Sequence, residues 1–300
     1  MLFNTYLFAD YSGARARVGQ RNAIRLAHAE DLQSPVILAR RLTREELVDA
    51  FVDHLREATR RGRRVCFGQD HQYGIPFALG RELGVAHLPW REALEALCAG
   101  TYAANAPAFD HASTFAKGLN AWLEAQGRLA YFYSATKSSL YGIPAKNPRG
   151  TDPSLYRLTE RCRPSSNAGA PKPFNRVGDN GTVGGQSLVG MVALRQLLST
   201  CARNNIPVAV WPFDGLSIVD PVYSNAHVLL EPYPTAVREA HVKQTDASDA
   251  LASAASVQNS DREGLLEHLL DLSSLTPLHG RVVRFEGWIA SHLPRRRLSS

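Results

Sequence analysis

Apolar and polar positions along the first part of the chain predict four strands. Residues 2–9 form a nearly continuous apolar run, which predicts a buried strand that ends at Asp10. Residues 21–29 alternate apolar and polar side chains, as a half-exposed antiparallel strand does, and residues 36–39 predict a third short strand. Residues 63–69 predict a fourth strand that ends at Asp70. An acidic residue therefore follows both the first and the last of these strands.

A helix is expected between the third and fourth strands. Thr43 and Glu46 have the spacing of a capping box, in which each side chain satisfies a backbone N–H group of the other residue. The apolar side chains that recur on one face of this helix are Leu47, Phe51 and Leu55. We expect that face to be buried against the sheet.

The rest of the chain predicts further helices and strands around a long loop. Helices are expected at residues 75–84, 91–100, 112–127, 187–204 and 265–272, and strands at 129–134, 206–213 and 225–230. Residues 137–185 are rich in Pro, Gly, Asn and Ser, which predicts a loop. The apolar stretch 282–289 is the last element expected before the basic residues near the C-terminus. We therefore expect one α/β domain over residues 1–300, with helices and loops inserted at about residues 75–185.

Residues 244–257 predict a helix that carries two acids in its first turn. Asp246 and Asp249 are three residues apart and project from one face. The simpler interpretation is that they stabilise the helix start, where carboxylates are favourable. The run of Ala and Ser behind them favours a second interpretation, because small side chains let a helix lie close to a sheet and bring Asp249 near the strand ends.

Composition narrows the class of protein only a little. The 300 residues are 44% apolar and 21% charged, as in ordinary globular proteins, and no apolar run is long enough for a transmembrane helix. The N-terminus lacks a basic leader, so we expect no signal peptide. The four cysteines are scattered without metal-ligand spacing, which favours reduced thiols and a cytoplasmic protein. A net charge of +6 permits a polyanionic partner.

Acidic residues follow several of the predicted strands. Asp10, Asp70, Asp214 and Glu231 each come after an apolar run. Ligand sites in α/β sheets gather at strand ends, although any one such acid is more often structural. Two carboxylates about 4 Å apart repel by about 4 kcal/mol at an effective dielectric constant near 20, so a converging set needs a cation. Oxygen ligands without His or Cys favour Mg²⁺ or Mn²⁺.

The order of these elements resembles the ribonuclease-H-like fold of nucleases, resolvases and transposases. The run that starts at Thr245 is similar to the acidic helix start of Holliday-junction resolvases. A closer resemblance is to the bacterial family called domain of unknown function 429, whose members are classed as predicted nucleases. The matching segments are Asp10, Asp70-His-Gln-Tyr-Gly-Ile-Pro76, Glu231-Pro-Tyr-Pro234, Asp246 to Ala250, and Glu286-Gly-Trp-Ile289. The last segment is a strand in that family, and the family more often has Gly-x-Asp where this chain has Ala9-Asp10.

The resemblance implies a mixed sheet, with three antiparallel strands leading into parallel ones, and a metal-dependent nuclease. Asp10 would bridge two Mg²⁺ or Mn²⁺ ions, and Asp70 and Asp249 would each hold one of them. Asp246 or Glu231 would complete the ligand set. The catalytic residues implied are therefore Asp10, Asp70 and Asp249.

Basic residues in the long loop are candidates for contacts with the phosphates of a DNA or RNA substrate. They are Lys137, Lys146 and Arg149. A second basic group, Arg60, Arg61, Arg63 and Arg64, ends the first helix, where cations are favoured in any case. His71, next to Asp70, is either a supporting group for the site or a structural histidine.

Two other functions remain open from the sequence. A phosphotransferase of the sugar-kinase and actin fold would share this strand order, although the chain has no second Asp-Gly-Gly phosphate loop. A module that kept the fold and uses it to bind nucleic acid or protein would need no metal. Separated or ion-paired acids would favour that module.

Overall fold

The described strands form one mixed sheet. The structure is a computed structural model that describes residues 1–99, 111–162, 172–179, 182–232 and 245–290. Its strands are β1 (Thr5–Asp10), β2 (Arg25–Glu30), β3 (Val36–Arg40), β4 (Val65–Gln69), β5 (Val208–Val210) and β6 (His227–Leu229). Their order across the sheet is β3-β2-β1-β4-β6-β5. Strands β1, β2 and β3 are antiparallel neighbours, whereas β1, β4, β6 and β5 run parallel. The predicted α/β class and the mixed sheet are therefore confirmed.

Alternating side chains of the central strands enter two different cores. Leu7 and Ala9 belong to a cluster with helices on one face of the sheet, whereas Tyr6 and Phe8 belong to a second cluster. Successive residues of a strand point to opposite faces, so the all-apolar run in β1 supplies both cores. This strand is buried along its whole length, as its sequence predicted.

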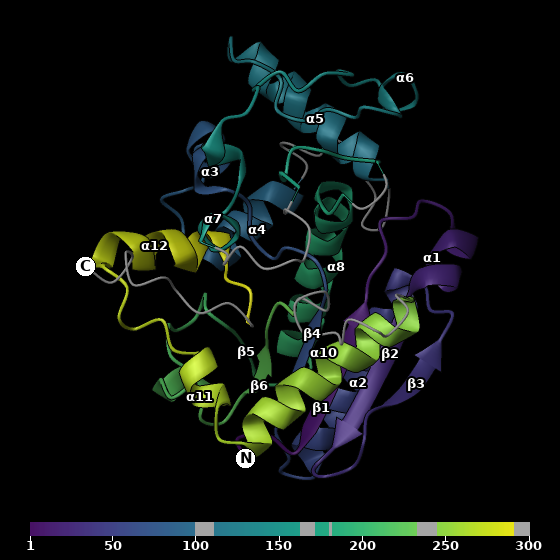
Figure 1. Cartoon of the computed structure of the whole chain (residues 1–300), viewed down its shortest axis with the longest axis vertical. Helices are drawn as coiled ribbons and strands as arrows, with labels where there is room; N and C mark the ends of the chain where they lie inside the picture. Colours follow the sequence, from purple (N-terminus) through teal and green to yellow (C-terminus); the bar gives the residue numbers. More distant parts are fainter. Residues whose placement is uncertain (100–110, 163–171, 180–181, 233–244, 291–300) are drawn as a thin grey trace.

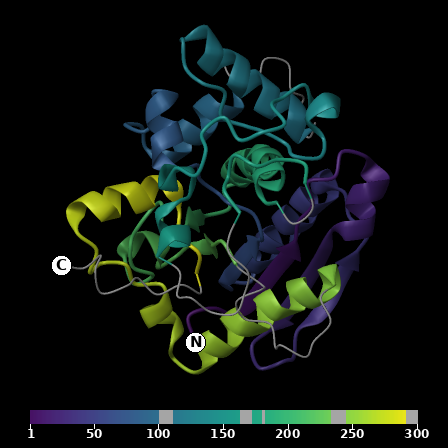
Figure 2. The same ribbon diagram turned by 45° about the horizontal axis from the view of Figure 1, so that its top comes forward.

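Helix α10 (Asp246–Arg262) covers one face of the sheet and lies against β1 and β2 (Figure 1). Figure 2 shows the same arrangement from another direction, with α10 crossing in front of these strands. Ala250 and Ala254 are fully buried in the second core. The small residues therefore bring the helix close to the strands, as the sequence predicted.

Helices α2 (Arg44–Arg60) and α8 (Gly184–Arg203) pack against each other within the other core. The predicted capping box at Thr43 and Glu46 is present. The predicted apolar face is also confirmed, since Leu47, Phe51 and Leu55 are fully buried. The Phe51 ring meets the Phe67 ring of β4 at a centroid distance of 5.5 Å, which joins the helix to the sheet.

The segment between β4 and α8 is built from short helices that lie together at the upper end of the view in Figure 1. They are α3 (Phe77–Glu82), α4 (Trp90–Cys98), α5 (Ala112–Ala125), α6 (Ser138–Tyr141), η1 (Pro153–Leu155) and α7 (Leu158–Arg161). Helices α4 and α5 pack on α8, so this segment rests on the first core. Residues 129–134 form no strand; Tyr133 makes only a single bridge, to Arg176.

Two other sequence predictions need correction. Residues 21–23 belong to helix α1 (Arg17–Ala23), so the second strand begins only at Arg25. Most of the closing stretch 282–289 belongs to helix α12 (Pro277–Glu286) and not to a strand. Thr276 caps this helix through the His279 N–H group, and a proline at the first position favours a helical start. The extended part is reduced to a bridge between Ile289 and Glu231.

The remaining helical elements among the described residues are η2 (Pro221–Tyr223) and α11 (Leu266–Leu269), the latter shorter than expected. Within the described ranges, no helix is long and apolar enough to cross a membrane.

Candidate active site

Asp10 and Asp70 lie at the carboxyl ends of adjacent parallel strands. Asp10 is the last residue of β1 and Asp70 follows β4, which pairs with β1 in parallel. Their side chains are hydrogen-bonded to each other. The Tyr11 N–H group donates to Asp70 Oδ1 at 2.6 Å and so fixes that carboxyl beside the end of β1. The structure therefore brings together the two acids that the strand pattern had placed at one edge of the sheet.

The first turn of α10 adds two more acids beside this pair. Asp246 is the first residue of the helix, and Asp249 is 8% exposed. The helix start is capped by Thr245 and Ser248, whose side chains each accept a hydrogen bond from the backbone N–H group of the other. Capping is therefore supplied by residues other than the two acids. We call Asp10, Asp70, Asp246 and Asp249 the acidic edge.

The pKa values of Asp10 and Asp70 depend on the charges of the other acids at this edge. Burial raises the pKa of Asp10 far above its usual range, and the negative charges of Asp70, Asp246 and Asp249 raise it further. Burial also raises the pKa of Asp70, to which Asp249 adds, while the hydrogen bond from Tyr11 opposes the shift. Without a cation, the pair therefore retains a proton at neutral pH.

Gln186 completes the surroundings of Asp70, although no pattern in the sequence singled it out. Its Nε2 donates to the Asp70 backbone oxygen at 2.7 Å and to Asp70 Oδ1 at 3.3 Å. Helix α8 begins at Gly184, three residues before the predicted start, which puts Gln186 in the first turn. A Cβ atom on Gly13 would lie 3.2 Å from Gln186 Cα, so a larger residue there would require a small shift of the loop after β1 or of α8. The feature of the sequence that could have drawn attention to Gln186 is the pair of glycines before it, Gly184 and Gly185.

The loop that follows Asp10 is held by a buried arginine. Arg44 is fully buried, and its guanidinium donates to the backbone oxygens of Ser12 and Ala14. Where the resembled family has Gly-x-Asp, this chain has Ala9-Asp10-Tyr11-Ser12. Arg44 therefore fixes the backbone that follows Asp10.

The donor atoms of the acidic edge suit a hard divalent cation, because all of them are carboxylate oxygens. Among the described residues, however, no group of three or more His, Cys, Asp or Glu is assembled closely enough to hold a metal ion. Asp10 and Asp70 are in direct contact, whereas Asp246 and Asp249 act on Asp10 through their charges. The residues therefore fit Mg²⁺ or Mn²⁺ in chemistry, and binding would require the α10 acids to approach the pair.

Glu231 does not join the acidic edge, which corrects its assignment as a metal ligand. Its two carboxylate oxygens accept hydrogen bonds from Arg157 Nη1 and Nη2 at 2.7 and 2.6 Å. Arg157 is fully buried and also ion-paired with Glu160. A guanidinium that occupies both oxygens of Glu231 leaves it poorly suited to bind a cation. Residues 233 and 234 of its motif lie outside the described residues.

Two other residues near the strand ends also have structural partners. Asp214 is ion-paired with Arg91 at 2.7 Å and accepts the Val210 N–H group, so it does not meet the acidic edge. His71 is buried, its ring packs against Tyr11 and Tyr73, and burial lowers its pKa to about 3. The histidine therefore acts as a neutral core residue beneath Asp70.

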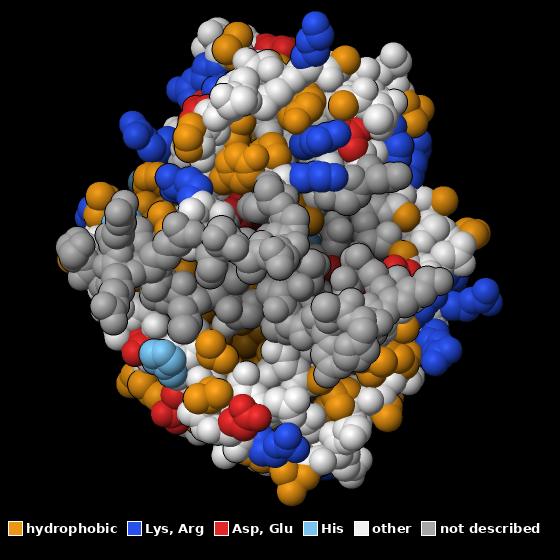
Figure 3. Space-filling view, in the orientation of Figure 1, with side chains coloured by type: hydrophobic (Ala, Val, Ile, Leu, Met, Phe, Trp, Pro, Cys, Tyr) orange, Lys and Arg blue, Asp and Glu red, His pale blue; other side chains and the backbone are white. Residues whose placement is uncertain are grey.

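The basic candidates for phosphate contacts differ in their availability. Arg149 donates to both oxygens of Glu82 at 2.9 and 2.8 Å, so its charge is already neutralised, which corrects its assignment to substrate. Lys137 and Lys146 are exposed, and their role in substrate binding stays a prediction. Lys and Arg side chains appear on the upper half of the face in Figure 3, around the segment between β4 and α8.

The second basic group lies at the amino end of β4, at the opposite end of this strand from Asp70. Arg60 and Arg61 pair with Glu57, and Arg63 pairs with Glu30 and Asp31. Arg64 donates to backbone oxygens of Leu2 and Tyr223. This group therefore supports the structure at the end opposite Asp70.

Comparisons with known proteins give no independent assignment. No protein-family model, no curated protein and no solved structure matches this chain.

Proposed function

We propose that this chain is a metal-dependent nuclease with a ribonuclease-H-like fold that hydrolyses phosphodiester bonds of DNA or RNA. The observation that carries the proposal is the direct contact between the Asp10 and Asp70 carboxyls at the ends of two adjacent parallel strands. The acidic first turn of α10 supports it, because its charges act on the same carboxyl. Acids whose pKa is raised by burial and by neighbouring carboxylates are costly for the fold and are typical of functional sites.

Asp10 and Asp70 would hold Mg²⁺ or Mn²⁺, with Asp249 and Asp246 as further ligands. Cations held there would supply an activated water and would stabilise the leaving oxygen. The chain itself orients the ligands: the Tyr11 N–H group and Gln186 fix the Asp70 carboxyl, and Arg44 fixes the loop after Asp10. The proximity of α10 to β1 supplies the remaining carboxylates.

A module that binds nucleic acid or protein without catalysis is the second candidate. It is favoured by the finding that no three-ligand group is assembled among the described residues. The hydrogen bond between Asp10 and Asp70 satisfies the two acids without a metal ion. The two candidates therefore differ in whether a divalent cation binds at the acidic edge.

Thermal unfolding with and without millimolar Mn²⁺, together with a cleavage assay, tests the proposal. A ligand that binds only the native state at 100 times its Kd stabilises it by about 2.7 kcal/mol, so the wild type should melt at a higher temperature. Asp10→Asn should lose this response, together with Mn²⁺-dependent cleavage of single-stranded or duplex nucleic acid. Asp53→Asn, at an exposed acid of α2, is the matched control and should behave as the wild type.

The outcomes distinguish the nuclease from the non-catalytic module and from the phosphotransferase. A wild type that neither binds Mn²⁺ nor cleaves nucleic acid would favour the non-catalytic module. Equal stabilisation of wild type and Asp10→Asn would show that Asp10 is no ligand and would contradict the proposed site. Transfer of the γ-phosphate of ATP to a small molecule, without nucleic-acid cleavage, would favour the phosphotransferase.

A further inference from the structure

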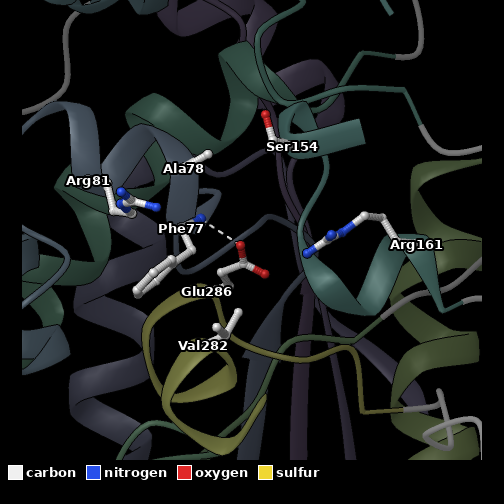
Figure 4. A pocket seen from close by; sticks show the side chains of 7 residues that line it. All are labelled: Phe77, Ala78, Arg81, Ser154, Arg161, Val282 and Glu286. Atoms are coloured by element: carbon white, nitrogen blue, oxygen red, sulfur yellow. Dashed lines mark hydrogen bonds between the residues drawn. The ribbon is translucent and has the colours of Figure 1, made fainter. Parts of the chain in front are cut away.

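Two adjoining hollows lie beside helix α3, outside the acidic edge. The first has a volume of about 170 Å³, and Figure 4 shows the side chains that line it. These are Phe77, Ala78, Arg81, Ser154, Arg161, Val282 and Glu286. The second has a volume of about 410 Å³ and is lined by Phe77, Arg81, Gly84, Ala86 and His87. The two hollows share Phe77 and Arg81, so they form one continuous surface around the start of α3.

The basic side chains of this surface remain available to a ligand. Arg81, Arg161 and His87 are exposed. In the ranges that the structure describes, neither Arg81 nor Arg161 makes an ion pair, unlike Arg149, which pairs with Glu82. Arg81 and Arg161 lie on opposite sides of Glu286 in Figure 4. A phosphate between them would meet two guanidinium groups, the side chain best suited to that anion.

Glu286 is the one acid that lines either hollow among the described residues, and its oxygens are already engaged. They accept the backbone N–H groups of Phe77 and Leu158, at the starts of α3 and α7 (Figure 4). Burial raises the pKa of Glu286 to about 7, while these hydrogen bonds and Arg161 oppose the shift. Both of its oxygens are therefore engaged by backbone N–H groups and not by Arg81 or Arg161. Asp152 lies outside both linings, although its charge reaches Arg161.

Phe77 supplies an aromatic ring to the lining of both hollows. Its side chain is partly exposed, and its ring meets Phe285 edge to face at a centroid distance of 5.6 Å, which fixes its orientation. Proteins that bind single strands combine a positively charged groove with aromatic rings on which bases stack. The hollow beside Phe77 is several times the volume of one water molecule, about 30 Å³ in the liquid, so it accepts a group of phosphate size.

We propose that these hollows form a binding track for a single-stranded polynucleotide, in which Arg81, Arg161 and His87 contact phosphates and a base stacks on Phe77. A single strand is favoured over a duplex, because only an unpaired base exposes its face to such a ring. This inference rests on the proposed function for its choice of nucleic acid as the ligand.

A chain of hydrogen bonds joins the track to the acidic edge. Glu286 accepts the Leu158 N–H group, and the adjacent Arg157 binds Glu160. Glu160 accepts a hydrogen bond from Gln72, two residues after Asp70. Arg157, Glu160 and Gln72 are buried, so this connection between the track and the acidic edge runs through the interior of the protein.

Fluorescence anisotropy with a labelled single strand of about 12 nucleotides, in EDTA, tests the track. Arg81→Gln/Arg161→Gln should weaken binding about tenfold or more and reduce the salt dependence of log K by about one unit for each phosphate that is no longer neutralised. Arg60→Gln/Arg61→Gln removes the same charge near the amino end of β4 and should change affinity less than about twofold. Thermal melts verify that each variant is folded. If the double variant does not fold, Arg81→Gln and Arg161→Gln are measured separately.

Phe77→Leu separates a nucleotide ligand from a free phosphate. It should weaken binding of the single strand about fivefold or more, because base stacking contributes about 1–3 kcal/mol, but leave competition by inorganic phosphate unchanged. Unchanged affinity in the Arg81 and Arg161 variants, equal losses in the control, or a duplex bound as tightly as the single strand would each overturn the track. Because binding is measured without metal, loss of cleavage alone would contradict only the proposed nuclease.

Discussion

Two sets of buried and half-buried carboxyls lie near the carboxyl ends of the parallel strands, and they differ in their partners. In the acidic edge, Asp10 and Asp70 contact each other, and the pKa of Asp10 is raised by burial and by neighbouring acids. In the Arg157 network, which we define as Arg157, Glu160 and Glu231, one guanidinium binds both acids. Position at a strand end is thus common to Asp70 and Glu231, but among the described residues no lysine or arginine forms an ion pair with Asp10 or Asp70. The comparison therefore distinguishes a candidate cation site from a structural ion-pair network.

The largest expected effect comes from breaking the Arg157 network. Arg157→Met should lower the free energy of unfolding by about 3–5 kcal/mol, because it leaves two buried carboxylates without their partner. Urea unfolding at neutral pH measures this loss. Arg157→Met/Glu231→Gln should recover part of it, since one of the stranded charges is removed. A fully stable Arg157→Met protein would contradict the structural role of the network.

A smaller effect is expected from pH at the acidic edge. Because the pKa of Asp10 is raised above its value of about 4 in the unfolded chain, the native state holds a proton that the unfolded state releases. The stabilising contribution of this group is present below about pH 4 and is lost as pH rises. Between pH 5 and 7, the metal-free protein should lose up to about 1.4 kcal/mol per pH unit from this one proton.

Asp10→Asn removes that proton equilibrium and should flatten the pH profile of unfolding in EDTA. It should also make the metal-free protein more stable near pH 7, because the amide is neutral in both states and folding no longer requires the uptake of a proton. Asp214→Asn, at an acid that is already paired with Arg91, is the control and should keep the slope of the wild type. Equal slopes in all three proteins would mean that the acids at β1 and β4 do not interact.

The smallest effects are expected at the start of α10, where they distinguish residues that cap the helix from acids that face Asp10. Thr245→Ala should lower the free energy of unfolding by about 1 kcal/mol, because Thr245 accepts the Ser248 N–H group. Asp246→Asn should have no effect or be slightly stabilising without metal, because relief of repulsion offsets the lost interaction with the helix dipole. A loss of about 0.3–1 kcal/mol in Asp246→Asn would instead indicate an ordinary helix-start acid. Chemical unfolding of both variants at low salt measures the difference.

Local patterns determined much of the fold and the first half of the candidate site. The apolar run in β1 needed burial on both faces, and Thr43 with Glu46 defined a helix start from residues three positions apart. Since both features depend on neighbours in sequence, they could be predicted without knowing the packing. The parallel pairing of β1 and β4 then places Asp10 and Asp70 at one edge.

Some patterns were ambiguous because a short apolar run fits the period of a helix as well as that of a strand. Residues 282–289 could form either a strand or a helix, and the cap at Thr276 with Pro277 favoured α12. Gln186 was missed because glycines at the start of α8 gave the appearance of a loop. A Cβ atom on Gly184 would lie 2.1 Å from the Phe174 backbone oxygen, so this glycine permits a close backbone contact that only the packing reveals.

Only the tertiary structure decided which charges remain available. Glu231 and Arg157 are 74 residues apart and Arg149 and Glu82 are 67 apart, yet each pair is joined by two hydrogen bonds. Nothing local in the sequence specifies such a pair, since it depends on how α7 and the loop segment pack against the sheet and α3. The sequence by itself therefore determined where acids and arginines stand along the elements. Packing determined which of them neutralise one another, because an ion pair needs proximity in space and not in sequence.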